Sequence, residues 1–75
     1  MADDDDRRLT AKVSAEEVAK DHAAGWNAAL DRALANASEV FDVGEHEVTV
    51  EFWAEIVVEN PGTIHNYCVS LTPHG

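Results

Sequence analysis

Residues 48–59 read VTVEFWAEIVVE, and this stretch decides the fold because apolar and polar side chains alternate along it. A period of two is typical of a β-strand that buries one of its faces. One face of the predicted strand carries Val48, Val50, Phe52, Ala54, Ile56 and Val58. The opposite face carries Thr49, Glu51, Trp53, Glu55, Val57 and Glu59.

A turn and a second strand follow this first one. In Asn60-Pro61-Gly62-Thr63, the proline presets φ and the glycine tolerates a positive φ. The sequence TIHNYCVSL then predicts a strand over 63–71, which Pro73 ends. Because a Pro-Gly turn of ordinary hand matches the twist of a hairpin less well than the primed turns do, a bulge that shifts the pairing is the alternative.

Pairing across a Pro61-Gly62 loop gives a self-consistent register, since residues of one face then meet each other. On the Phe52 face it pairs Ile56 with Tyr67, Ala54 with Val69, and Phe52 with Leu71. On the Trp53 face it pairs Trp53 with Ser70, Glu55 with Cys68, Val57 with Asn66, and Glu59 with Ile64.

The N-terminal half predicts a short strand and a helix. Residues 9–13, LTAKV, alternate, and Ser14 to Glu17 match a capping box. An apolar stripe at helical spacing follows, through Val18, His22, Trp26, Leu30, Ala33, Ala37 and Phe41. Gly44 is the predicted stop, and Gly25 could mark a break with Asp21 capping a shorter second helix. The order predicts an α+β fold, β-α-β-β, with an antiparallel sheet curved around one helix and its Phe52 face covered by the helical stripe.

The length of 75 residues fits one domain, which we assign to residues 9–75. Residues 1–8, MADDDDRR, predict a disordered acidic tail because successive aspartates repel each other and bury nothing. Chains this short usually need a disulfide, a metal or an oligomer contact for stability. The sequence holds one cysteine, Cys68, so no intrachain disulfide can form, and a metal or self-association becomes the expected reinforcement.

The formal charge of −10 argues against two classes of partner. Such a surface repels nucleic-acid phosphates and anionic membranes, so we expect no nucleic-acid partner and no membrane partner. No apolar run approaches the roughly 20 residues of a membrane span, and no secretory signal is visible at the N-terminus. Together with a free cysteine, these features predict a cytoplasmic protein.

The sequence offers no catalytic constellation. Cys68 has no histidine on its face, because His65 lies three positions away along the strand and points to the other face. Glu55 opposite Cys68 would raise the pKa of the thiol rather than activate it. His46 with Asp42 or Glu45 could bind a cation, but a solvated corner is the simpler interpretation. We therefore predict neither an enzyme nor a metal site.

The Trp53 face has no cover from the domain itself, because the helix packs on the opposite face. It is too apolar for a solvated face and too polar for a dry core, which favours a ligand site or a subunit interface. The simpler alternative is a half-exposed tryptophan that packs on its own strand neighbours. We take Trp53, Glu55, Cys68 and Ser70 as the candidate ligand-binding residues.

Three segments resemble the dodecin family of small β-α-β-β proteins. They are residues 25–38, GWNAALDRALANAS, residues 53–57, WAEIV, and residues 67–71, YCVSL. The resemblance implies a hollow dodecamer and a flavin, FMN or riboflavin, stacked on Trp53. Where the family carries a flavin-contacting glutamine beside the tyrosine of its third strand, this sequence has Cys68.

Two functions follow from these observations. The first is a homo-oligomeric protein that binds or stores a planar, flavin-like aromatic small molecule. The alternative is a structural or interaction module whose Trp53 face makes only subunit contacts.

Overall fold

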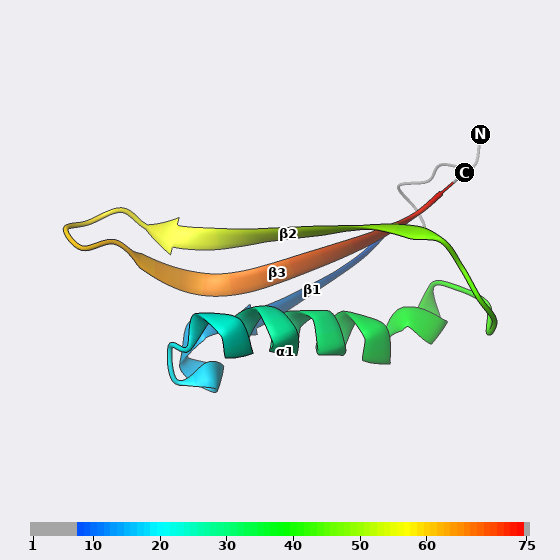
Figure 1. The fold of residues 1–75 in the computed structure, drawn as a ribbon, viewed down its shortest axis with the longest axis horizontal. Coiled ribbons are helices and arrows are strands. Elements are labelled where there is room, and N and C mark those ends of the chain that lie inside the picture. Colours follow the sequence, from blue (N-terminus) through cyan, green and yellow to red (C-terminus); the bar gives the residue numbers. More distant parts are fainter. Residues whose placement is uncertain (1–7, 75) are drawn as a thin grey trace.

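The computed structural model describes residues 8–74 as a three-stranded antiparallel sheet with one α-helix along one side (Figure 1). The elements in chain order are β1 (Leu9–Ser14), η2 (Ala15–Val18), α1 (His22–Ala35), η3 (Ala37–Glu39), β2 (Val48–Val57) and β3 (Thr63–Pro73), where η marks a short 3-10 helix. The strand order in the sheet is β1-β3-β2. The predicted α+β fold and the β-α-β-β order are confirmed. Most of the predicted acidic tail, residues 1–7, lies outside the described residues.

The capping box at Ser14 is present, but it starts η2 rather than the long helix. The Ser14 hydroxyl accepts from the backbone N–H of Glu16 at 3.2 Å, and the Glu17 carboxylate accepts from the backbone N–H of Ser14 at 3.0 Å. Ala19 and Lys20 then adopt positive φ values of 53° and 62°, which interrupt the helix. A single helix across the whole apolar stripe is therefore wrong.

The helix α1 begins where Asp21 caps it, with the Asp21 carboxylate accepting from the backbone N–H of Ala24 at 3.1 Å. This confirms the shorter helix capped by Asp21 but not a break at Gly25, which lies inside α1. The helix ends at Ala35, well before the predicted stop at Gly44. At that end the Asn36 N–H bonds to the carbonyls of Arg32 and Ala33, tightening the last turn before η3 continues the chain.

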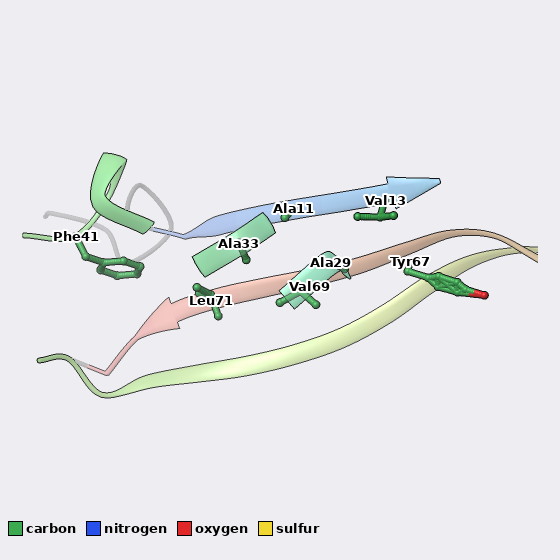
Figure 2. Close-up of a cluster of buried hydrophobic side chains, with 8 residues drawn as sticks. All are labelled: Ala11, Val13, Ala29, Ala33, Phe41, Tyr67, Val69 and Leu71. Atoms are coloured by element: carbon green, nitrogen blue, oxygen red, sulfur yellow. The ribbon is translucent and has the colours of Figure 1, made fainter. Parts of the chain in front are cut away.

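The hydrophobic core lies between α1 and two of the three strands (Figure 2). Its buried members are Ala11 and Val13 from β1, Ala29 and Ala33 from α1, Phe41, and Tyr67, Val69 and Leu71 from β3. No core member comes from β2. Small alanines on α1 and a glycine facing Tyr67 let the helix approach the sheet closely.

The expected cover of the Phe52 face by the helix is wrong for β2. Phe52 is 50% exposed and Ile56 is 61% exposed, although both side chains point to the helix side of the sheet. The strand order explains this, since β2 lies beyond β3 at the sheet edge (Figure 1). A helix about 10 Å wide covers about two strands spaced about 4.8 Å apart, and α1 covers β1 and β3.

The hairpin register differs from the predicted one by two residues along β3. Ala54 pairs with Tyr67 and Phe52 pairs with Val69, where the short Pro61-Gly62 loop predicted Val69 and Leu71. The strands are joined by residues 58–62, because the twist of a hairpin does not suit a tight Pro-Gly turn of ordinary hand. A shift of two keeps every side chain from 66 to 71 on its predicted face.

A bulge changes the face of one residue nearer the turn. Glu55 pairs with Asn66 while its neighbour Ile56 pairs with Ile64, so His65 is the extra residue on β3. Ile64 therefore leaves the Trp53 face, where the sequence placed it, and packs against the core side. The Trp53 face consequently has fewer large apolar side chains than predicted.

Candidate functional site

The candidate site lies on the outer face of the sheet, defined as the face opposite α1. Trp53 and Glu55 reach it from β2, and Cys68 and Ser70 reach it from β3. Trp53 pairs directly with Cys68, and Ser70 is the next outer-face residue along β3. The structure therefore brings the four predicted site residues together, although their pairings differ from the predicted ones.

The Trp53 indole leans from β2 over the central strand β3. Its Nε1–H donates to the Ser70 hydroxyl at 3.3 Å, and the side chain remains 41% exposed. Cys68 and Ser70 have no exposed surface, although no helix covers this face in the described residues. Side chains from the two flanking strands must cover them, and the indole is the largest of these. The result is a fixed aromatic platform on top of a buried thiol and hydroxyl.

Ser70 is the polar anchor of this platform. Its hydroxyl also bonds to the Thr10 hydroxyl at 3.2 Å and accepts from the Arg8 guanidinium at 3.4 Å. Thr10 is the β1 residue paired with Ser70, so the anchor joins the three strands. This network fixes the edge of the indole and leaves the rest of its surface available for contact.

Two ion pairs cross β3, one on each side of Trp53 along the strand. Glu55 accepts from the Asn66 amide at 2.6 Å and from Lys12 Nζ at 3.2 Å. The Asn66 hydrogen bond and then Lys12 hold the pKa of Glu55 below its ordinary value of 4.5. Glu51 pairs with Arg8 at 3.7 Å. The face therefore alternates charge around the indole and is close to neutral, in contrast to the chain as a whole.

Cys68 is a buried, unreactive thiol. Burial and the nearby Glu55 carboxylate raise its pKa above 9.0, and Lys12 offsets part of this effect. The direction agrees with the like-charge effect that the sequence predicted, although burial is the larger cause. Because Cys68 and Ser70 have no exposed surface, a bound molecule would contact Trp53 and Glu55, with the other two beneath them.

Sequence reasoning missed the contribution of β1 to this face. It placed Asn66 on the face correctly but opposite Val57, and so missed its hydrogen bond to Glu55. Thr10 and Lys12 alternate with the core residues Ala11 and Val13, so their outward direction could have been read from the pattern. Their proximity to Trp53 could not, because it depends on β1 pairing with β3 rather than with β2. Arg8 precedes the strand and carried no signal.

The histidines lie in separate places. His22 Nδ1 bonds to the hydroxyl of the buried Tyr67 at 3.1 Å, and His46 Nε2 donates to the Asp42 backbone carbonyl at 2.7 Å. Within residues 8–74, no three His, Cys, Asp or Glu side chains gather in a way that could hold a metal ion. An open hollow of about 340 Å³ lies near the C-terminal end of α1, lined by residues such as Leu34, Phe41 and Val48. It lies on the helix side, away from Trp53.

The chain matches no protein-family model, no curated protein and no solved structure. In the part of the chain that the structure describes, no helix has the length and apolar character needed to cross a bilayer.

Proposed function

We propose that this protein is a self-assembling small-molecule binding protein that holds a planar aromatic ligand, such as riboflavin or FMN, against Trp53. The observation that carries the proposal is the Trp53 indole, which is anchored by Ser70 at 3.3 Å yet stays 41% exposed. An aromatic side chain fixed in this way can stack on a planar ring at little entropic cost. The sequence resemblance to dodecins supports the same ligand class.

The surroundings of the indole suit a polarised planar ring better than a purely apolar one. Glu55 and Glu51 flank Trp53 on the same strand face, and each lies within 4 Å of a cation from the N-terminal part of the chain. A ring with donor and acceptor groups at its edge could exchange hydrogen bonds with these exposed pairs. We place the ring over Trp53 and its polar edge toward Glu55 and Lys12.

Fluorescence titration tests this function. The chain has two tryptophans, Trp26 and Trp53, so the Trp26→Phe variant isolates the signal of Trp53. We expect saturable quenching of Trp53 by riboflavin or FMN, and loss of ligand binding in Trp53→Ala. Glu45→Ala, which removes an exposed loop carboxylate instead, is the matched control and should keep wild-type affinity. Only linear, collisional quenching by both flavins would contradict the proposal.

A second function is favoured by the closed polar network of the outer face. Ser70 and Glu55 already have partners within the domain, and no buried side-chain N or O atom in residues 8–74 lacks a hydrogen-bond partner. A face whose polar groups are already hydrogen-bonded within the domain can pack against another subunit without binding a ligand. In this alternative the protein is an assembly module, and Trp53→Ala would weaken the oligomer while no flavin would bind.

A further inference from the structure

We propose that two copies of the chain join through β2 in an antiparallel pair. The two copies are related by a two-fold axis perpendicular to the sheet, which passes midway between the two opposed Ala54 residues; below, an axis is named by the residue that it sets opposite its own counterpart. The pair would extend the two sheets into one, in the order β1-β3-β2-β2-β3-β1. This inference rests on the self-assembly part of the proposed function, names the surface responsible, and is independent of the ligand.

The two edge strands of the sheet, β1 and β2, differ in length and in whether a side chain bonds to their backbone. At the β1 edge, the strand is six residues long and the Arg32 guanidinium donates to the Lys12 backbone carbonyl at 2.7 Å. At the β2 edge, the strand is ten residues long, has no proline and receives no side-chain hydrogen bond on its backbone in the described part of the chain. Long apolar edges without such protection are the ones that pair with another strand.

The helix side of β2 is apolar and uncovered, and its pattern is symmetric about Ala54. Val50 is 41% exposed, Phe52 50% and Ile56 61%, and Val58, which directly follows the end of β2, is 84% exposed. In an antiparallel pair centred on Ala54, Phe52 of one copy lies opposite Ile56 of the other, and Val50 lies opposite Val58. The only residue that meets itself is the small Ala54. A strand with this symmetry is complementary to a second copy of itself.

The positions of the glutamates on β2 favour this register over registers in which the strand is shifted along its partner. Centred on Ala54, the pair places Glu51 opposite Val57 and Glu55 opposite Trp53, so no two carboxylates face each other. An axis through Trp53 would oppose Glu51 with Glu55, and an axis through Glu55 would oppose that residue with itself. Like charges directly opposite one another are destabilising, which is severe for a chain of charge −10. An axis through Phe52 separates Glu51 and Glu55 from each other, but it brings two phenyl rings together and leaves Val58 opposite His46 and Glu59 opposite Glu45.

The position of α1 leaves room for the contact. Because α1 covers β1 and β3, the two helices of the pair would lie about four strand spacings apart, or about 19 Å. Subtracting one helix diameter of about 10 Å leaves a groove about 9 Å wide beneath the paired β2 strands. Trp26 already stands at the margin of this groove, edge-on to Phe52 with ring centroids 5.9 Å apart. The two sets of aromatic and aliphatic side chains would fill the groove.

Disulfide trapping at the axis tests the register directly. In an antiparallel pair, opposed Cα atoms are about 4.5–5.5 Å apart, which is within the range that a disulfide spans. In a Cys68→Ala background, mild oxidation of Ala54→Cys should convert most of the chain into a covalent dimer. Thr49→Cys and Phe52→Cys are controls on the same strand. Their own counterparts would lie about 34 Å and about 14 Å away along the strand, so neither should cross-link.

A charge scan makes the test independent of cysteine chemistry. Ile56→Glu would place a carboxylate against the apolar Phe52 of the other copy, and sizing should then shift toward the 8.2 kDa monomer while far-UV circular dichroism stays unchanged. Val43→Glu makes a comparable change at a loop residue that is 97% exposed, and it should keep wild-type assembly.

Three outcomes would overturn the inference. An oligomer without cross-linking at position 54 would place the interface elsewhere while leaving self-assembly intact. Cross-linking at Phe52→Cys instead would place the axis at another residue. A wild-type monomer would refute both the interface and the self-assembly part of the proposed function.

Discussion

The strands β2 and β3 have similar sequence patterns, but β3 is largely buried and β2 is largely exposed. Both alternate apolar and polar residues, and they pair with each other along nearly their whole length. Yet Tyr67, Cys68, Val69 and Ser70 of β3 have no exposed surface, whereas every residue of β2 except Val48 and Ala54 is exposed. The difference comes from sheet order, since β3 is central and β2 is at the edge. Alternation thus predicts two faces, but the neighbours of a strand decide whether either face is covered.

The largest expected effect on stability comes from truncating one aromatic side chain on each of these two strands. Tyr67→Ala removes a fully buried ring and should lower the free energy of unfolding by about 3–5 kcal/mol. Phe52→Ala removes a half-exposed ring from β2, and its cost should shrink as the protein is diluted, because that ring would act through assembly. Urea denaturation at several protein concentrations measures both. Equal, concentration-independent losses would mean that β2 belongs to the fold as much as β3 does.

A second test concerns the close packing of α1 on β3. A Cβ atom at Gly25 would overlap the Tyr67 ring, so Gly25→Ala should destabilise the fold by about 1–3 kcal/mol. In an ordinary helix the same change would stabilise by about 1 kcal/mol. Ala23→Gly, at an exposed position of α1, measures the effect of helix propensity alone. Stabilisation by Gly25→Ala would show that Tyr67 does not lie where we place it.

The cover of Cys68 by Trp53 gives a third prediction. The thiol is buried and its pKa is raised, so a thiol reagent should modify native protein very slowly. Trp53→Ala should speed the modification several-fold by uncovering the thiol, whereas Trp26→Phe on the other side of the sheet should not. The absorbance change of a disulfide reagent follows the reaction. Equal rates in wild type and Trp53→Ala would mean that the indole does not cover β3.

The smallest expected effect is electrostatic. The Asn66 hydrogen bond and Lys12 lower the pKa of Glu55, so ionised Glu55 stabilises the folded state above the ordinary pKa of 4.5 that the group has in the unfolded chain. That contribution is lost as the pH falls through the lower folded pKa, and it is small because the carboxylate is exposed. Carbon-detected NMR titration of the Glu55 carboxyl should show a higher pKa in Asn66→Ala than in wild type. Lys20→Met, remote from this face, should leave the pKa unchanged.

Sequence reasoning predicted most of the helices and strands and which side chains share a face of a strand. It did not predict the hairpin register or the order of the strands in the sheet. Alternation at 48–59 and the capping signals at Ser14 and Asp21 depend on local geometry, which the sequence determines directly. The hairpin register and the position of Ile64 depend on a loop and a bulge whose twist must fit the strands, and residue types alone did not fix them. The exposure of Phe52 depends on strand order, a global property.

The candidate site was predictable to the same extent. Trp53, Glu55, Cys68 and Ser70 share a face because a period of two requires it, and a register shift of two preserved that face. Which of them can touch a ligand was not predictable. Burial of Cys68 and Ser70 depends on the direction in which the indole leans and on Arg8 and Thr10 reaching across from the β1 side.

A native mass spectrum of the full chain with riboflavin in excess tests the central claim, that both faces of β2 bind something outside the domain. We predict an assembly with an even number of chains, as a two-fold β2 interface requires, that retains riboflavin in wild type and loses it in Trp53→Ala. A single ligand-free species at 8.2 kDa would contradict the account, because both faces of β2 would then be left to solvent.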